Sequence, residues 1–323
     1  MRYLGLDLGG TNIKGAVIEV DADATPSVIA TGSTETLAEG GPVSVVRRMI
    51  ELGSSMADEH GPFAGAGIGV PGLFDFESGE VIFLTNLPGE WEGYPLRATI
   101  ADGLGIAATL INDARAFTLA EATVGAGRGC SSVVGFTLGT GIGGGLFING
   151  RLHLGAFGVA GELGHQTVAP DGPVCGCGNR GCLEAVARPP AIAAAAGRET
   201  MEEVIEGAAA GDPASVAALD QAVTYLGIGI ANVLTMVGPE RVVIGGGAAT
   251  AGAALLDPIR SAVRDRVTLV PPDQIEILAA ELGNEAGAIG AALAAVETPT
   301  KDQRFLAGEI PSAATRREER PAD

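Results

Sequence analysis

The sequence predicts an α/β protein built from two similar domains that face each other across a cleft. Of its 323 residues, 46% are hydrophobic but only 4% are aromatic, and 50 are glycine. That mixture is typical of α/β packing with many tight turns. The length suits two domains of ordinary size, each with its own core. A strand–turn–strand pattern near the N-terminus also returns in the middle of the chain.

The first half reads as alternating strands and helices. The apolar run YLGLDL predicts a strand, GGTN a glycine turn, and IKGAVIEV a second strand. A third strand is expected around SVIATGST, followed by a helix from Pro42 to about Glu59. AGIGVPG predicts a buried strand that ends in a turn, and AATLIND another short strand. A helix from Ala114 to Thr123 should start just after Asn112 and Asp113.

The opening pattern has an echo in the middle of the chain. LGLDLGGTNIKGAVIEV is repeated as VGFTLGTGIGGGLFING, with Leu8 matched by Leu138, Gly9 by Gly139, Gly15 by Gly145 and Ile18 by Ile148. One such glycine turn could equally be an ordinary hairpin. Two copies at equivalent places in a duplicated chain instead predict paired loops facing each other across the cleft.

The second half continues with a long helix from about Pro213 to Met236, a strand at RVVIGGG, a helix to about Arg266 and a strand at QIEILAA. A last helix should run from Glu285 to about Val296. We expect an N-terminal domain over residues 1–115, with the last helix (about 285–297) packing back on it, and a C-terminal domain over 116–284. Residues 298–323 show little periodicity, which predicts a disordered tail.

The net charge of −19 disfavours nucleic acid as a partner, because an acidic surface repels the phosphate backbone. A phosphorylated ligand would have to be held mostly by backbone N–H groups, helix N-termini and a metal ion. The start MRYLGLDLGG does not read as a signal peptide, and the longest apolar run, YLGIGIANVLTMVG, has 14 residues. We therefore expect a cytoplasmic protein without a membrane partner.

Three glycine-rich turns are candidate phosphate or nucleotide sites. In DLGGTNIKG the glycines let backbone amides approach phosphate oxygens, and Asp7 could bind Mg²⁺. A strand follows this turn, so it is neither a Walker loop nor a Rossmann fingerprint. LGTGIGGG is the partner turn, and VVIGGGAA ends a strand before a helix. The ATP-binding residues expected from these turns are Asp7, Gly9, Gly10, Thr11, Asn12, Lys14, Gly139, Thr140, Gly141, Gly246 and Gly247.

The tripeptide Ile111–Asp113 stands at a strand end and has two interpretations. A carboxylate there could accept the proton of an attacking hydroxyl, as phosphoryl transfer to an alcohol requires. Alternatively, Asn112 and Asp113 only cap the following helix, which spacing alone favours. Both can hold, since the two residues need not share a role.

Residues 161–184 concentrate three of the four cysteines and one of the three histidines. His165, Cys175, Cys177 and Cys182 match a closed tetrahedral Cys₃His zinc site, which is structural rather than catalytic. Three cysteines cannot all pair as disulfides, and the remaining alternative is a reduced loop with incidental cysteines.

Together these residues resemble the ROK family (repressor, open reading frame, kinase), and its sugar kinases in particular. The resemblance spans DLGGTNIKGA to the final helix, and its most specific part combines GELGH with CGCGNRGCLE. GVPG, NDARAFTLAE and LGTGIGGG also match the family in order. The resemblance implies an actin-like, duplicated ribonuclease-H-type ATPase fold and ATP-dependent phosphorylation of a hexose, most simply glucose.

The resemblance also implies roles for individual residues. Asp113 would be the general base, and Gly72, Asn112, Asp113, Glu162, His165 and Glu184 would line the sugar pocket. The first two glycine turns would hold phosphates with Mg²⁺, and Gly246 and Gly247 would lie near the adenosine. N-acetylglucosamine, N-acetylmannosamine, fructose, mannose and allose remain alternative substrates. A homodimer or homotetramer is expected from the resemblance alone.

Two non-kinase functions stay open. The family's repressors carry an N-terminal helix-turn-helix domain, for which Asp7 leaves no room here, and the acidic charge disfavours DNA. A sugar-sensing regulator without catalysis is the main alternative, and an ATP-switched assembly protein is the other. The second of these would not need Glu162, His165 and Glu184 beside Asp113.

Overall fold

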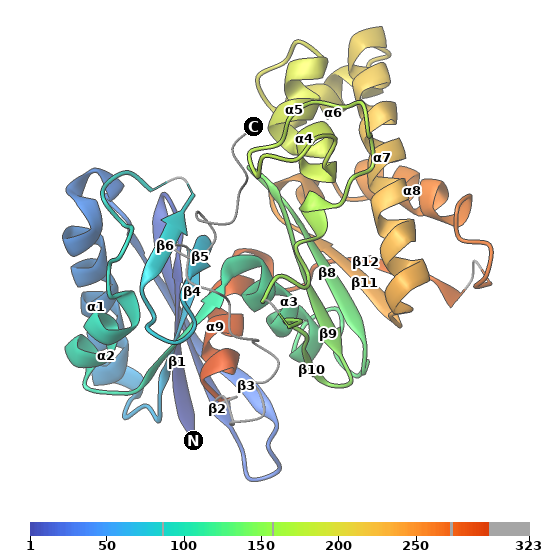
Figure 1. The fold of residues 1–323 in the computed structure, drawn as a ribbon. Coiled ribbons are helices and arrows are strands. Elements are labelled where there is room, and N and C mark those ends of the chain that lie inside the picture. The colour runs from blue at the N-terminus through green and yellow to red at the C-terminus, as the bar shows by residue number, and fades with distance from the viewer. Residues whose placement is uncertain (86, 157, 272–273, 297–323) are drawn as a thin grey trace, which may run out of the picture.

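The computed structural model describes residues 1–85, 87–156, 158–271 and 274–296. They form two lobes, each built on a five-stranded sheet (Figure 1). The tail predicted to be disordered, 298–323, lies outside the described residues.

The N-terminal sheet has the strand order β3-β2-β1-β4-β7. β1 pairs antiparallel with β2 and parallel with β4, β2 pairs antiparallel with β3, and β4 pairs parallel with β7. The strands are β1 (Arg2–Leu8), β2 (Asn12–Val20), β3 (Pro26–Glu35), β4 (Ala66–Val70) and β7 (Ala108–Asn112); the small hairpin β5 (Gly72–Phe74) and β6 (Val81–Leu84) stands beside them.

The C-terminal sheet repeats this topology in the order β10-β9-β8-β11-β12. Its first strand again pairs antiparallel with the second and parallel with the fourth. The strands are β8 (Val133–Leu138), β9 (Ile142–Ile148), β10 (Arg151–Leu152), β11 (Arg241–Gly245) and β12 (Glu276–Ala279). The duplication predicted from the repeated glycine turn is therefore present in the fold.

The two copies differ in the length of the turn. Leu8 pairs with Ile13, but Leu138 pairs with Ile142, so the second hairpin turn is one residue shorter. The sequence match used one offset of 130 residues throughout. This offset is correct for β1 and β8, but it is wrong by one residue for β2 and β9, where it matched Gly15 with Gly145 and Ile18 with Ile148. The sequence alignment hid this because glycines fill both positions 144 and 145.

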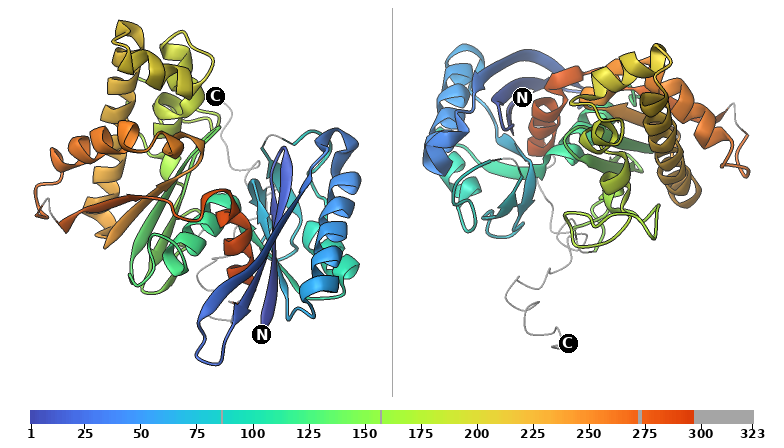
Figure 2. Two further views of the ribbon diagram at one scale, coloured as in Figure 1. Left: turned by 180° about the vertical axis from the view of Figure 1, so that it is seen from behind. Right: turned by 90° about the horizontal axis from the view of Figure 1, so that it is seen from above.

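Helices cover both sheets on their outer faces. α1 and α2 pack on the N-terminal sheet, and α7 and α8 pack on the C-terminal one (Figures 1 and 2). The helices are α1 (Gly41–His60), α2 (Leu96–Leu104), α3 (Asp113–Thr123), α4 (Leu183–Ala187), α5 (Pro189–Ala195), α6 (Met201–Ala209), α7 (Pro213–Val237), α8 (Ala253–Arg264) and α9 (Ala286–Val296), with short 3₁₀ helices η1 (Ala38–Gly40), η2 (Leu163–His165), η3 (Gly247–Ala251) and η5 (Gly283–Glu285).

α3 and α9 lie between the two sheets and share one apolar core (Figure 2). α9 packs against β1 and β4, whereas α3 packs against β8 and β9. Each lobe has a second core on its outer side. The last helix therefore packs on the N-terminal sheet, and α3 packs on the C-terminal sheet. The domain boundaries at 115 and 284 stay a prediction.

One detail differs from the sequence expectation. The helix expected directly after RVVIGGG is split into η3 and α8, because Gly252 between them has φ of 58°, which a continuing helix does not allow. The long helix expected from about Pro213 to Met236 is confirmed as α7, which ends one residue later.

By length and composition α7 could cross a membrane, and half of its most apolar 18-residue window is buried in the protein. A core helix of a soluble protein meets the same criterion, so this is weak evidence for a span.

Candidate active site

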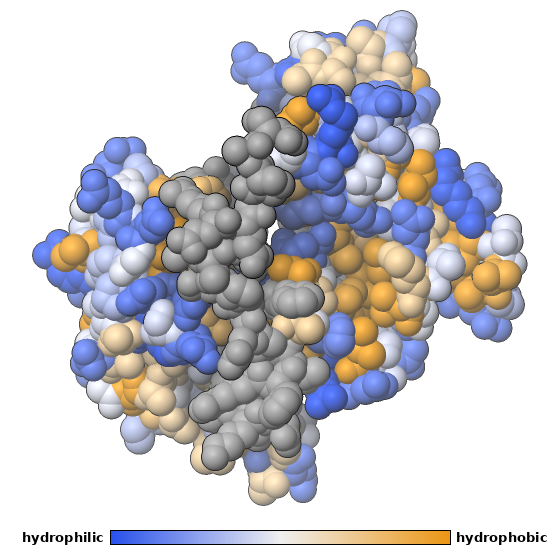
Figure 3. All heavy atoms as spheres, in the orientation of Figure 1, coloured by the Kyte–Doolittle hydropathy of each residue, from blue (hydrophilic) through white to orange (hydrophobic). Residues whose placement is uncertain are grey.

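The predicted phosphate residues, together with Asn112 and Asp113, lie at or just after the carboxyl ends of the central strands in both sheets. In the N-terminal sheet Asp7 lies opposite Gly69 of β4, which lies opposite Ile111 of β7, so Asp7 and Asn112 reach the same edge. In the C-terminal sheet Thr137 of β8 lies opposite Gly245 of β11. Ligands of open α/β sheets bind outside this edge. The space-filling view shows mostly hydrophilic residues near α4 and hydrophobic ones over β8 and β9 (Figure 3).

Asp7 is held tightly at the end of β1. Its carboxylate sits between Gly69 and Gly287, and a Cβ atom on either glycine would clash with it. Burial raises the pKa of Asp7 to about 7, with further increases from Asp113 and Glu285 that Lys14 opposes. A carboxylate whose charge is this unfavourable gains from a bound cation, so Asp7 suits the Mg²⁺ role predicted for it.

The first glycine turn is closed by its own backbone and by β3. Gly9 N–H donates to the Asn12 carbonyl (3.1 Å), and Gly10, Thr11 and Asn12 are exposed. Lys14, directly across from Asp7 in the sheet, donates from Nζ to the Asn284 carbonyl (2.6 Å). In this structure the lysine therefore ties β2 to the segment before α9.

The second glycine turn is supported from two sides. Gly139 N–H donates to the Gly141 carbonyl (2.9 Å), and Gly246, with φ of 87°, packs on the Leu138 backbone so closely that no Cβ would fit. Gly247 follows at the start of η3. Glu184 Oε2 accepts a hydrogen bond from Ile142 N–H (3.0 Å). Glu184, predicted as a sugar ligand, thus contacts the partner turn. It also lies beside the loop that carries the four predicted zinc ligands (residues 165–182, the zinc loop).

Asn112 is the N-cap of α3, which is one of the two roles that the sequence left open for this pair. Its Oδ1 accepts from the N–H groups of Ala114 (3.1 Å) and Arg115 (3.3 Å), and its Nδ2 donates to the Gly72 carbonyl (3.4 Å). The cap is worth about 1 kcal/mol to the helix. It also fixes the turn that carries Gly72.

The Asp113 carboxylate accepts a hydrogen bond from the N–H of Ala114 (2.8 Å). Burial raises its pKa to about 6, the Ala114 N–H opposes this, and the negative charge of Glu162 adds to it. A carboxylate with a raised pKa is a better proton acceptor, and a value near 6 still leaves it ionised at neutral pH.

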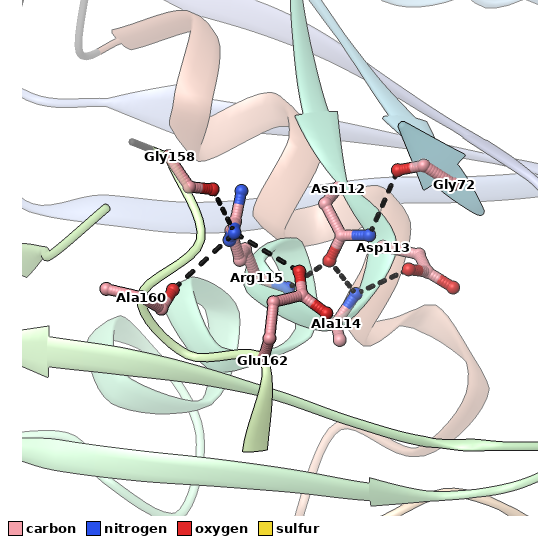
Figure 4. A network of polar contacts seen from close by, with 8 residues as sticks. All are labelled: Gly72, Asn112, Asp113, Ala114, Arg115, Gly158, Ala160 and Glu162. Atoms are coloured by element: carbon pink, nitrogen blue, oxygen red, sulfur yellow. Dashed lines mark hydrogen bonds and ion pairs between the residues drawn. The ribbon is translucent and has the colours of Figure 1, made fainter. Parts of the chain in front are cut away.

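Arg115 belongs to the same network and was not singled out from the sequence. Its side chain is buried, and one guanidinium nitrogen, NH2, donates to the Gly158 carbonyl (2.5 Å) and lies within 3.3 Å of Glu162 Oε1 (Figure 4). The Ala160 carbonyl lies 3.5 Å from the same nitrogen. Arg115 thus holds the segment before η2 and turns Glu162 toward Asp113. The available signal was a single arginine in a helix with few other charged residues.

The four predicted zinc ligands come together in space. The side-chain ligand atoms of His165, Cys175, Cys177 and Cys182 all lie within 4.8 Å of one another. Tetrahedral zinc with ordinary bond lengths would place sulfur atoms roughly 3.8 Å apart and sulfur and nitrogen roughly 3.6 Å apart. The Cys177 and Cys182 Sγ atoms are 3.7 Å apart, and Cys175 Sγ is 3.6 Å from His165 Nδ1. The residues fit the ion.

The zinc loop is shaped by its own backbone. Cys175 N–H donates to the Asn179 carbonyl (2.7 Å), and Gly181, with φ of 67°, lies against the Ala169 carbonyl where no Cβ would fit. Since Nδ1 of His165 faces the cysteines, Nε2 is the ring nitrogen left for another partner. Glu184 Oε1 lies 3.7 Å from Cys175 Sγ, so the loop also positions this carboxylate.

Comparison with known proteins identifies the family. The ROK family model matches residues 3–298. This chain belongs to the ROK family.

The glucokinase and hexokinase relatives are similar over nearly their whole length. The chain is 36% identical to a glucokinase from Thermotoga maritima, covering 90% of this chain and 96% of that protein. The ROK hexokinase structure from Thermus thermophilus superposes with a TM-score of 0.80 at 35% identity, covering 92% of this chain and 98% of the other. A ROK glucokinase from Streptomyces griseus, solved with glucose and AMPPNP, has a TM-score of 0.75 at 31% identity and coverage of 92% and 100%. The predicted family and its duplicated, actin-like fold are confirmed.

Proposed function

We propose that this ROK protein is an ATP-dependent hexokinase that converts glucose to glucose 6-phosphate with Asp113 as general base. The observation that carries the proposal is Asp113 itself. It is a carboxylate of raised pKa at the edge where β1, β4 and β7 end, beside Glu162 and opposite a paired set of glycine turns. The relatives named glucokinase, and the neighbour solved with glucose and AMPPNP, support glucose and ATP as the substrates.

The chemistry follows from these positions. The 6-hydroxyl oxygen of the sugar attacks the γ-phosphorus of ATP, the new O–P bond forms, and the bond to the ADP oxygen breaks. Asp113 accepts the hydroxyl proton. Backbone N–H groups of the glycine turns stabilise the charge spread over the phosphoryl oxygens, which is the main catalytic task in phosphoryl transfer.

Two metal ions complete the proposal. Asp7 would supply an oxygen ligand of the kind that Mg²⁺ prefers, and the bound ion would neutralise phosphate charge. His165, Cys175, Cys177 and Cys182 would hold zinc as a structural ion, which fixes the His165 ring so that Nε2 faces the sugar. Asn112, Glu162 and Glu184 would complete the sugar contacts.

Other hexoses and one other class of function remain alternatives. The polar side chains around Asp113 suit the hydroxyl groups of a hexose but do not distinguish one epimer from another. N-acetylglucosamine, N-acetylmannosamine, fructose, mannose and allose are therefore also candidate substrates. A sugar-sensing regulator would bind sugar without turnover. We also propose a homodimer or homotetramer, which sedimentation would test.

The deciding experiment is sugar-dependent ADP release with Mg-ATP across glucose and these five sugars. We expect glucose to be preferred by orders of magnitude in kcat/KM. Preference for another sugar would correct the substrate and keep the kinase. No turnover with any sugar, from protein shown to contain zinc, would favour the regulator.

A further inference from the structure

Thr36 makes two hydrogen bonds to the first glycine turn. It follows β3, at the end of the edge strand, and its side chain is fully buried. Its Oγ1 donates to the Gly9 carbonyl (2.6 Å), and its backbone N–H donates to the Thr11 carbonyl (2.8 Å). Two carbonyl groups of the turn therefore point at one residue from a distant part of the sequence.

Because the peptide bond is planar, these two hydrogen bonds also fix the direction of the N–H groups of Gly10 and Asn12. In a trans peptide the C=O of one residue and the N–H of the next point to opposite sides. With the Gly9 carbonyl turned to buried Thr36, the N–H of exposed Gly10 points outward, and it has no acceptor among the described residues. The Thr11–Asn12 peptide likewise turns its N–H away from Thr36.

The Gly9–Gly10 peptide needs such a restraint. Glycine populates both signs of φ, so a peptide between two glycines can flip at little steric cost. A flipped peptide would present a carbonyl oxygen to a phosphate and remove a donor. Gly10 has no side chain to prevent this, and the Thr36 hydroxyl is the group that holds the Gly9 carbonyl.

We infer that Thr36 is a positioning residue for ATP: it turns the Gly10 N–H outward as a phosphate donor. The inference rests on the proposed function in assigning the first glycine turn to the nucleotide phosphates. Thr36 touches neither substrate, and its effect passes through the Gly9–Gly10 peptide.

The test compares Thr36→Val with Thr36→Ser and with Thr31→Val. Valine keeps the shape and the backbone N–H but loses the hydroxyl, serine keeps the hydroxyl, and Thr31 is an exposed threonine of β3. We expect the Kd of Mg-ATP, measured by calorimetry without sugar, to rise about tenfold in Thr36→Val, as loss of one buried hydrogen bond implies. Thr36→Ser and Thr31→Val should stay near wild type, and sugar affinity should be unchanged in all three.

Unchanged Mg-ATP affinity in Thr36→Val would overturn the inference, as would an equal loss of nucleotide and sugar affinity. If Thr36→Val does not fold, Thr36→Ala and Thr36→Ser differ only in the hydroxyl, and their Kd values must differ in the same sense. Wild-type protein that binds Mg-ATP but phosphorylates no hexose would refute the proposed function and leave this comparison intact. Wild-type protein that does not bind Mg-ATP would overturn both.

Discussion

Asn112 and Asp113 are neighbours in the chain, yet the structure gives them different partners. The side chain of Asn112 binds two N–H groups of the helix N-terminus and the Gly72 carbonyl, whereas the Asp113 carboxylate shares only the Ala114 N–H with it. The capping role therefore belongs mainly to Asn112, and the role of general base is the one proposed for Asp113. Because Asp113 is not needed as the cap, it can be changed without removing the cap.

We expect Asp113→Asn to lower kcat by about 10²–10⁴, the usual contribution of a general base, with Mg-ATP affinity retained. Steady-state kinetics and calorimetry measure the two effects. Asp102→Asn, an exposed aspartate of α2, is the control and should be neutral. Near-normal turnover in Asp113→Asn would remove this residue from the mechanism.

The raised pKa of Asp113 predicts a pH dependence. The base acts in its deprotonated form, so kcat/KM should be full above pH 7 and fall as pH drops through about 6. Since the charge of Glu162 raises this pKa, Glu162→Gln should move the acidic limb to lower pH, whatever it does to the maximum. A limb that stays in place in Glu162→Gln would show that another group controls it.

Arg115 predicts a specific effect on sugar binding. The lysine side chain is shorter, so its ammonium group would not reach the place from which one guanidinium nitrogen of Arg115 serves both the Gly158 carbonyl and Glu162. We expect Arg115→Lys to raise the KM for sugar about tenfold, the equivalent of one charge-assisted hydrogen bond, and to leave the KM for ATP unchanged. Arg128→Lys, at an exposed arginine, is the matched control. Equal increases in both KM values would indicate a general loss of structure.

Sequence spacing pointed to the groups proposed to carry the chemistry but not to those that hold them in place. Asp7 and Asp113 stand at strand ends, and the zinc ligands cluster in one stretch, so local patterns reveal them. Thr36 and Arg115 act on Gly9 and Gly158, which are 27 and 43 residues away. Such contacts depend on how strands and loops pack, and no local pattern encodes them.

Among the elements, the central strands of both sheets and the long helices were predictable, including short strands such as β7 and β12, whereas the short helices α4 to α6 were not. β1, β2, β8 and α7 lie within two residues of the expected bounds. The stretch between α5 and α7 was not assigned, although α6 begins with a capping box in which Thr200 and Glu203 bond reciprocally. That signature could have been read from the sequence. α4, with five residues, gives too little periodicity to detect.

The zinc loop is the element whose loss should affect the pocket most. Cys177 is exposed, so Cys177→Ala leaves no cavity in a core. We expect this variant to lose zinc stoichiometry and sugar affinity together, because His165 and Glu184 are both positioned by the loop. Cys130→Ala, outside the loop, should keep both. Metal analysis and the KM for sugar measure the two effects. A zinc-free variant that binds sugar normally would refute the proposal that zinc orients His165.

At the scale of the whole molecule, the duplication was visible in sequence because each half opens with the same glycine turn. The position of the two central helices was not. α3 and α9 approach so closely that a Cβ on Gly290 would clash with the Ala116 carbonyl. α9 also lies against β1 and β4 through Gly5 and Gly67, where no Cβ fits. These glycines are spread over the chain, and only the folded arrangement shows that they serve one seam.

The contact between α3 and α9 sets the distance between Asp113 and Asp7. α3 begins with Asp113, and α9 begins beside Asp7 through Gly287, so the contact between the helices relates the proposed base to the proposed Mg²⁺ ligand. Gly290→Ala would force the helices apart. Overpacking costs about 1–3 kcal/mol, partly offset by the roughly 1 kcal/mol by which alanine favours a helix.

We therefore expect Gly290→Ala to lower Tm by a few degrees and also to lower kcat, measured by thermal unfolding and by sugar-dependent ADP release. Gly65→Ala is the matched control, because a Cβ there would meet the Ala107 carbonyl oxygen at 3.5 Å and the Ala295 Cβ of α9 at 3.9 Å, which is ordinary contact. A lower Tm with unchanged kcat would show that the seam supports stability alone. An unchanged Tm would show that the helices can separate without cost, against the packing seen here.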